Sequence, residues 1–292
     1  MPSLDALSRF RRKLSCTLTE RRHRVPILMY HSIADCQTSR HSYYATTTSP
    51  TAFAQQMRCL HENGYRTVTL QESLENLALR EPSAKLVVIS FDDGYADLYR
   101  QAFPILNEYS FTATVFVITG LLKVRRTTFN GTECLTLAEV RELHSQGISI
   151  GSHTLSHRTL TRLPQTQLEE ELHTSKEFLE DELGAPVKSF AYPYAFPEAD
   201  RRFVRIMENL LIKCGYDNGV TTILGSVQQG ANRYFLPRLP AHSGLRLFRA
   251  ELRGACDWLH GPQYFAKTVK HFLRANSRWG ESLLSVKGRE QP

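Results

Sequence analysis

The sequence predicts an α/β fold in which short parallel strands alternate with helices and close into a barrel. Apolar segments rich in β-branched and aromatic residues recur along the chain, and segments with apolar residues at helical spacing lie between them. This alternation is typical of parallel βαβ units. The chain has 292 residues, which matches the ~250 residues usual for a single α/β barrel. We therefore expect one main barrel domain.

The candidate strands are short apolar runs that end in polar residues or glycine. They are Pro26–Tyr30, Arg66–Leu70, Leu86–Phe91, Thr112–Ile118, Ile148–Ile150, Lys188–Tyr192, Gly219–Ile223 and Tyr234–Leu239. A continuous apolar run such as Leu86–Phe91 is typical of a strand that is buried on both faces of a parallel sheet. These segments together predict a closed or nearly closed barrel.

The candidate helices are bounded by residues that start or stop helices. Pro50 opens one helix, which Gly64 ends, and Thr136 and Glu139 form a capping-box pattern at the start of another. The remaining candidate helices span Gln71–Arg80, Asp97–Tyr109 and Gln165–Leu183. Because Pro104 lies inside the second of these segments, we expect a kink or a restart there.

Charge and cysteine usage favour a protein of a reducing compartment without a nucleic-acid partner. The net charge is +7, and the basic excess lies in the first residues and in the tail after Leu245. A solvated surface is the favoured explanation, because basic and aromatic residues are not interleaved as in nucleic-acid sites. The 6 cysteines are scattered without a C-x-x-C pair, which predicts free thiols. No secretory signal and no run of ~18 apolar residues is visible, so we expect a cytoplasmic protein.

The chain divides into a central domain and two extensions. We expect a basic N-terminal extension over residues 1–24, the barrel over residues 25–245, and a helical C-terminal extension over residues 246–292. The first extension places apolar residues at helical spacing between basic ones, namely Leu4, Leu7, Phe10 and Leu14. A helix packed on the domain or a frayed basic arm is favoured, and a helix in weak peripheral contact with a membrane is the alternative.

Two pairs of reactive side chains follow short apolar strands. Asp92 and Asp93 end the strand Leu86–Phe91, and burying adjacent carboxylates is unfavourable unless a cation or hydrogen-bond donors take up the charge. His153 and His157 are four residues apart, so their rings project to one side of a helical turn or of a loop that enters a helix. Because strand ends meet on one face of a parallel barrel, we expect the pairs to converge. Two imidazoles and a carboxylate are a common ligand set for a catalytic divalent metal.

Five motifs along the chain form an ordered set. They are Leu28-Met-Tyr-His31, Ser90-Phe-Asp-Asp-Gly-Tyr95, Ala113-Thr-Val-Phe-Val117, Gly151-Ser-His-Thr-Leu-Ser-His157 and Phe190-Ala-Tyr-Pro-Tyr194. This set resembles the motifs of the NodB-type polysaccharide deacetylase family, which is similar to carbohydrate esterase family 4. The resemblance covers roughly Val25 to His242. It implies a distorted (β/α) barrel of seven to eight parallel strands and a metal-dependent hydrolase.

Carried over by position, the resemblance implies a role for each residue of the two pairs. Asp92 corresponds to the general base, and Asp93, His153 and His157 correspond to the metal ligands. The metal would lower the pKa of a water molecule, and Asp92 would take its proton during attack on an acetamide carbonyl. The metal and the backbone amide of Tyr194 would stabilise the oxyanion. Zinc suits two histidines and one carboxylate, and related enzymes also use other divalent ions.

Three positions bear on how complete the family pattern is. Many members carry an arginine that orients the catalytic Asp where this chain has Ala191, so the partner of Asp92 is not identified. Leu239-Pro-Ala-His242 matches the last family motif in spacing, which makes His242 the candidate general acid and a loop histidine the alternative. His31 follows a strand and has three alternative roles. It would contact the catalytic residues without touching the substrate, make a hydrogen bond at the strand end, or replace His242 as the general acid.

The favoured function is removal of N-acetyl groups from an amino-sugar glycan, oligosaccharide or glycolipid precursor. Tyr192, Pro193 and Tyr194 are expected to line the substrate groove, because aromatic faces pack on sugar rings. Loops such as Asp35–Ser49 and Leu122–Thr132 are expected to set specificity. Hydrolysis of a small non-sugar amide or cyclic imide is the alternative within enzymes. A non-catalytic carbohydrate-binding relative is the alternative outside them.

Overall fold

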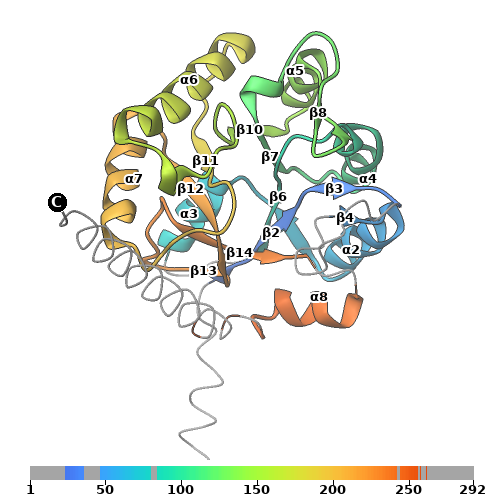
Figure 1. Ribbon diagram of the computed structural model, residues 1–292. Coiled ribbons are helices and arrows are strands. Elements are labelled where there is room, and N and C mark those ends of the chain that lie inside the picture. Colours follow the sequence, from blue (N-terminus) through green and yellow to red (C-terminus); the bar gives the residue numbers. More distant parts are fainter. Residues whose placement is uncertain are drawn as a thin grey trace, which may run out of the picture.

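The computed structural model, which describes residues 24–35, 47–79, 84–241, 244–255, 257 and 261, contains a closed ring of parallel strands. In ring order the strands are β2 (Ile27–Tyr30), β14 (Leu236–Pro240), β12 (Asn218–Leu224), β11 (Ser189–Ala191), β10 (Ser149–Ser152), β7 (Thr114–Val117) and β6 (Lys85–Phe91). The ring closes because β2 also pairs with β6 (Figure 1). A further strand, β5 (Tyr65–Thr67), pairs with the beginning of β6. The predicted distorted α/β barrel is confirmed.

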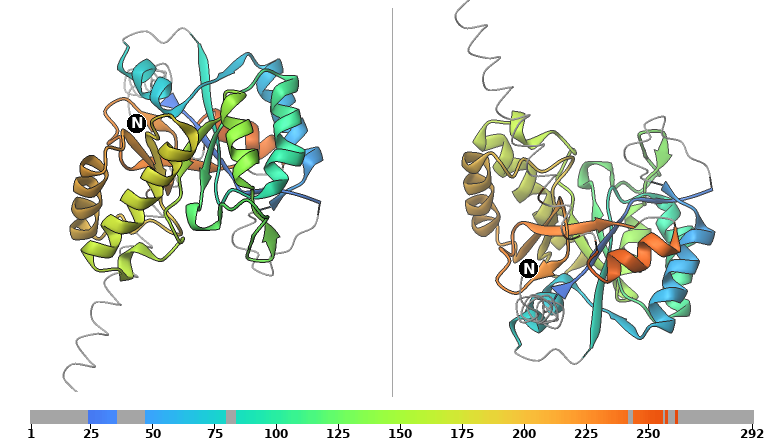
Figure 2. Two further views of the ribbon diagram at one scale, coloured as in Figure 1. Left: turned by 90° about the horizontal axis from the view of Figure 1, so that it is seen from above. Right: turned by 90° about the horizontal axis from the view of Figure 1, so that it is seen from below.

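Helices surround the ring of strands (Figure 1). They are α2 (Pro50–Glu62), α4 (Phe103–Glu108), α5 (Leu137–Ser145), α6 (Gln165–Leu183) and α7 (Arg201–Lys213), with α8 (Leu245–Leu252) against α2. Figure 2 shows α3 (Leu70–Ala78) at one end of the barrel and a short hairpin of β8 (Thr128–Phe129) and β9 (Thr132–Glu133) at the other end. The hairpin therefore lies at the end of the barrel opposite to α3.

Four short strands and three single turns complete the described structure. The strands form two pairs, β1 (Arg24–Val25) with β13 (Val227–Gln228) and β3 (Ser32–Ile33) with β4 (Thr47–Thr48). The turns are a π-helical turn at Leu98–Ala102 and 3-10 turns at Thr119–Leu121 and Leu160–Arg162. Within the described residues, no helix has the length and apolar character needed to cross a membrane.

Alternate residues of the strands face two different apolar layers. On β6, Leu86 and Val88 pack in the interior of the barrel together with α3, whereas Val87 and Ile89 pack in the layer beneath the surrounding helices. The other strands contribute to the interior layer Ile27, Phe116, Ala191, Val220 and Leu236. The same alternation places Ser90 and Asp92 on the inward side of β6, above Leu86 and Val88. The inward-facing side chains of β6 are thus apolar along most of the strand and polar at its carboxyl end.

Helix boundaries follow the local signals with few exceptions. The capping box of Thr136 and Glu139 is present in full at the start of α5, and Gly184 ends α6 with a φ of 62°. The π-helical turn before α4 provides the restart expected at Pro104. Leu70 was expected to end a strand but begins α3, because Thr69 caps that helix with its side chain. Neither α7 nor the β8–β9 hairpin is among the elements that the sequence predicts.

Several predictions fall outside the described residues. They concern the N-terminal extension up to residue 23 with its membrane contact, most of the loop Asp35–Ser49, and His242. In the segment predicted as the C-terminal extension, residues up to 252 belong to α8, and after residue 255 only residues 257 and 261 are described.

Candidate metal centre and active site

Asp93, His153 and His157 form a compact cluster at the carboxyl ends of β6 and β10. The Nε2 atoms of His153 and His157 lie 3.4 Å and 3.3 Å from Oδ1 of Asp93. One potential ligand atom from each residue lies within 4.8 Å of the other two. The structure therefore brings together the three residues that the sequence singles out as metal ligands.

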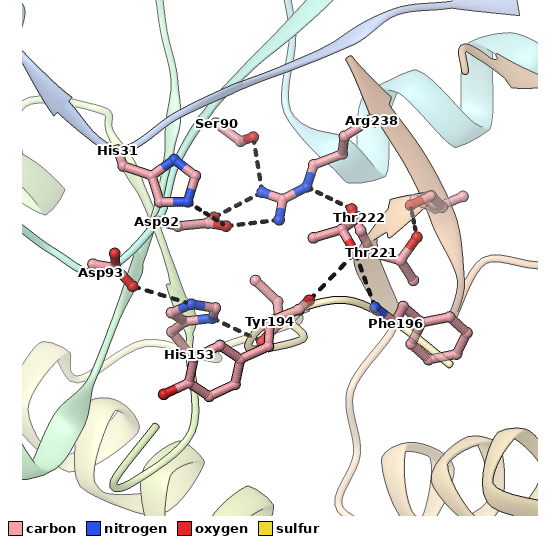
Figure 3. A network of polar contacts seen from close by, with 12 residues as sticks. His31, Ser90, Asp92, Asp93, His153, Tyr194, Phe196, Thr221, Thr222 and Arg238 are labelled. Atoms are coloured by element: carbon pink, nitrogen blue, oxygen red, sulfur yellow. Dashed lines mark hydrogen bonds and ion pairs between the residues drawn. The ribbon is translucent and has the colours of Figure 1, made fainter. Parts of the chain in front are cut away.

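The contacts of the Nδ1 atoms of His153 and His157 help to show whether a metal ion fits the cluster. Nδ1 of His153 lies 2.9 Å from the carbonyl oxygen of Ala191, and this contact directs Nε2 towards Asp93 (Figure 3). Nδ1 of His157 is buried and has no hydrogen-bond partner among the described residues. Two imidazole nitrogens and one carboxylate, all nearly buried, form a donor set that fits a divalent ion.

Hydroxyl groups and a buried carboxylate shape the loop that carries the histidines. Thr154 and His157 have φ angles of 70° and 54°, so this segment is a loop and the helical-turn alternative is wrong. Oγ1 of Thr154 accepts a hydrogen bond from the His157 amide, and Oγ of Ser152 accepts one from the Thr154 amide. Glu171 of α6 accepts hydrogen bonds from both the amide and the hydroxyl of Ser156. The loop is thereby fixed from inside and from α6.

Asp92 is held by a buried bidentate ion pair with Arg238 of β14. Nη1 and Nη2 of Arg238 donate hydrogen bonds of 2.7 Å to the two carboxylate oxygens of Asp92. Nη1 also lies 3.3 Å from Oγ of Ser90, and Nε donates a 2.9 Å hydrogen bond to the carbonyl oxygen of Thr221 (Figure 3). Arg238 is therefore the partner of Asp92 that the sequence motifs leave unidentified.

Arg238 is not among the site residues predicted from the sequence, although its position in the sequence contains a signal. Arg238 lies between Leu236 and Leu239 in an otherwise apolar candidate strand, and a buried arginine requires an anionic partner. The strand order β6–β2–β14 explains why its partner is not on an adjacent strand. The guanidinium reaches Asp92 across the interior of the barrel.

The charges around the two carboxylates keep both of them ionised. Burial acts to raise the pKa of Asp92, but Arg238, His153 and His31 together outweigh it and hold the pKa below the ordinary value of 3.8. Burial acts in the same direction on Asp93, where hydrogen bonds from His153 and His157 outweigh it and hold the pKa well below 3.8. The adjacent carboxylates thus have different partners, a guanidinium for one and two imidazoles for the other.

His31 joins the site on the side of Asp92. Its Nε2 atom lies 3.9 Å from Oδ2 of Asp92, which is longer than a hydrogen bond (Figure 3). Burial lowers the pKa of His31 below 6.5, although the charge of Asp92 acts in the opposite direction. The imidazole of His31 is therefore held towards its neutral form. The other candidate acid, His242, lies outside the described residues, shortly after the end of β14.

Of the three predicted groove residues, only Tyr194 exposes its side chain. Tyr192 is 2% exposed and its ring packs against other aromatic rings, namely Phe190, Phe196 and Phe235. Pro193 is also buried. The structure corrects the prediction for these two residues, because Tyr192 belongs to the core and Pro193 is buried beside it in the chain. Tyr194 is 54% exposed, and its ring centroid lies 4.6 Å from that of His157.

Phe129 of β8 is a second aromatic ring at the metal cluster. Its ring centroid lies 4.9 Å from that of His157, and the two rings meet edge to face. Phe129 also lies near the ring of Tyr95, which is itself 7% exposed and belongs to the core. Most of the β8–β9 hairpin lies in the loop Leu122–Thr132, which the sequence predicts to set specificity. It thus brings an aromatic side chain to the site.

Comparisons with known proteins show which family shares this sequence and fold. The family model described as polysaccharide deacetylase matches residues 79–215. YxkH of Bacillus subtilis, which is assigned to the polysaccharide deacetylases, is 33% identical over 228 residues, or 78% of this chain and 75% of that protein. The poly-β-1,6-N-acetyl-D-glucosamine N-deacetylase of Staphylococcus aureus strain MRSA252 is 26% identical over 202 residues, or 66% of this chain and 67% of that protein.

A solved structure shows the same fold. The deacetylase PplD of Streptococcus pyogenes, in complex with acetate, superposes with a TM-score of 0.68 at 27% identity, and the match covers 78% of this chain and 98% of that one. The extent of the match to YxkH shows the family directly. This chain therefore belongs to the polysaccharide deacetylase family and is a hydrolase of carbon–nitrogen bonds.

Proposed function

We propose that this protein removes N-acetyl groups from an amino-sugar glycan in a reaction that depends on a divalent metal ion. The observation that carries the proposal is the separation of two adjacent carboxylates. Asp93 lies with His153 and His157, whereas Asp92 is paired with Arg238 and stays apart from that cluster. A site with one carboxylate among imidazoles and a second one held ionised beside them is suited to hydrolysis of an amide.

Each residue of the site has a role in this proposal. Asp93, His153 and His157 would hold a divalent ion, and zinc is the ion that this donor set suits first. The bound ion would supply the Lewis acidity that makes a water molecule acidic. Asp92, ionised and oriented by Arg238, accepts the proton of the attacking water. The backbone amide of Tyr194 donates a hydrogen bond to the oxyanion that forms from the acetamide carbonyl.

The leaving amine requires a proton, and a histidine is proposed to supply it. His31 is the weaker candidate, because burial favours its neutral form and its position beside Asp92 is that of a supporting residue. His242 therefore stays the first candidate, and it follows β14, the strand that carries Arg238.

An amino-sugar polymer is the proposed substrate class. Tyr194 and Phe129 both place aromatic rings beside His157, and sugar rings pack on aromatic faces through their C–H groups. The similarity to an N-deacetylase of poly-β-1,6-N-acetyl-D-glucosamine supports a polymer of this kind. A glycolipid precursor that contains the same acetamido sugar is the alternative substrate, because it presents the same acetamide group.

An acetate-release screen tests the proposal. The protein, supplied with zinc or cobalt, is incubated with β-1,6-linked and β-1,4-linked N-acetylglucosamine oligomers and, separately, with a small cyclic imide. We expect acetate from at least one oligomer series and no ring opening of the imide. Ring opening without acetate release would replace the proposed substrate class. A protein that takes up no metal and releases no acetate would be a carbohydrate-binding relative without activity.

A further inference from the structure

The backbone at Tyr194 has a conformation that other parts of the structure must hold in place. Its φ angle is 60°, in the left-handed region that residues other than glycine seldom adopt and that costs about 1 kcal/mol or more. Tyr194 follows the end of β11 and precedes the exposed Ala195, so it lies in a turn and not in a regular element. This turn carries both the proposed oxyanion donor and the exposed ring beside His157.

One hydroxyl group ties the two sides of this turn together. Oγ1 of Thr222, on β12, accepts a 2.9 Å hydrogen bond from the amide of Phe196 and donates a 3.3 Å hydrogen bond to the carbonyl oxygen of Tyr194 (Figure 3). A threonine hydroxyl has one donor hydrogen and can accept at the same time, so both bonds form together. The peptide groups on either side of Ala195 are thereby fixed relative to β12.

An irregularity in β12 accompanies this contact. Val220 pairs with Leu236 and Leu224 pairs with Arg238, so four steps along β12 match two steps along β14. Extra residues of this kind form a bulge, which redirects side chains away from the regular alternation and is common beside active sites. Thr222 lies within the extra residues. The hydroxyl that binds the Tyr194 turn therefore comes from the irregular part of β12.

Thr221, the residue before Thr222 in the bulge, contacts the Arg238 side chain that pairs with Asp92. The carbonyl oxygen of Thr221 accepts the hydrogen bond from Nε of Arg238, the residue that holds Asp92. The hydroxyl of Thr221 donates to the carbonyl oxygen of Leu236 and accepts from the amide of Ile223, which stabilises the bulge. Two successive residues of β12 thus connect to the base on one side and to the Tyr194 turn on the other.

We propose that Thr222 is a positioning residue that holds the Tyr194 turn, and with it the oxyanion donor, in the geometry that the reaction requires. The inference rests on the proposed function, because it assigns the oxyanion contact to the Tyr194 amide. Removing an oxyanion donor altogether lowers kcat by about 10²–10³. Loosening the turn leaves the donor present but misplaced, so we expect a loss of roughly tenfold in kcat with little change in KM.

Isosteric substitution separates the hydroxyl from the shape of the side chain. Thr222→Val removes the hydroxyl at nearly constant volume, Thr222→Ser keeps the hydroxyl, and Thr166→Val makes the same change at an exposed position of α6. All proteins are assayed loaded with metal, and metal content is measured for each. We expect the roughly tenfold loss of kcat in Thr222→Val alone, with normal metal content, and recovery in Thr222→Ser to within about threefold of wild type. If Thr222→Val does not fold, Thr222→Ala replaces it in the comparison.

Hydrogen exchange gives a readout that does not depend on activity. We expect the amide of Phe196 to exchange faster in Thr222→Val than in wild type, and Thr222→Ser to restore its protection. Wild-type kcat and unchanged exchange in Thr222→Val would overturn the inference, and so would a loss of kcat that Thr222→Ser fails to recover. If wild type releases no acetate from any glycan, the proposed function fails, and the exchange experiment still decides whether Thr222 holds the turn.

Discussion

Asp92 and Asp93 are neighbours in the sequence, yet their side chains meet different partners in the structure. Asp92 continues the inward face of β6 above Val88 and meets Arg238. Asp93 has a φ angle of 69°, so the chain turns there and its carboxylate meets the histidines at the end of β10. An aspartate tolerates this left-handed conformation better than a β-branched residue does. The local backbone thus separates the two carboxylates.

The pair of Arg238 and Asp92 gives a prediction about stability. Replacing Arg238 with Met leaves a buried carboxylate without its cation, which typically costs about 3–5 kcal/mol. We expect Arg238→Met to lower the free energy of unfolding by about that amount, measured by urea denaturation, and to lose acetate release. Adding Asp92→Asn removes the unpaired charge, so the double variant should recover part of the stability and none of the activity. An Arg238→Met protein as stable as wild type would contradict this account of the pair.

The residues of the site differ in how far the sequence could reveal them. Asp93, His153 and His157 follow strand ends in recognisable motifs, and the structure brings them together as expected. Arg238 could not be assigned to Asp92, because the assignment depends on strand order and on which side chains face the interior. A sequence pattern contains neither of these long-range facts.

At the scale of elements, the β8–β9 hairpin is the part that the sequence left unassigned and that reaches the site. Its two strands contain two residues each, which is too short for the alternation of apolar and polar residues to show. The hairpin bends at Asn130 and Gly131, which have φ angles of 49° and 82°. These residue types favour turns, so the turn was detectable even though the strands were not.

Phe129 provides a test of the hairpin's role in substrate binding. Loss of an aromatic contact with a sugar ring is worth roughly 1 kcal/mol, or about fivefold in affinity. We expect Phe129→Ala to raise KM for an N-acetylglucosamine oligomer by about that factor, with a much smaller change in kcat. Thr128→Ala, at an exposed position of the same hairpin, is the matched control and should behave as wild type. An unchanged KM in Phe129→Ala, with normal metal content, would remove this residue from the groove.

The elements that the sequence placed best are those with local boundary signals. The capping box of α5 and the glycine after α6 lie within a few residues of the boundaries that they define. By contrast, α7 begins after a loop at Asp200, and its apolar face was not recognised although Asp200 caps it. Local chemistry therefore defined helix ends better than it identified every helix.

At the scale of the whole molecule, closure of the barrel concentrates the chemistry at one end. The pairing of β2 with β6 brings the first and third predicted strands together, and β14 joins them from the end of the chain. His31, Asp92 and Arg238 come from these three strands and meet where their carboxyl ends converge. The sequence predicted parallel strands in about the right number, whereas their order around the ring depends on pairings between distant segments.

The central claim is that one carboxylate holds a metal while its neighbour acts as a base. The most direct test measures metal content and acetate release together in wild type and in Asp92→Asn, after chelation and reloading with zinc. The account predicts that both proteins retain the metal, that chelation abolishes acetate release by wild type, and that Asp92→Asn loses at least ~10²-fold in acetate release. Full activity in Asp92→Asn, or acetate release that survives removal of the metal, would contradict it.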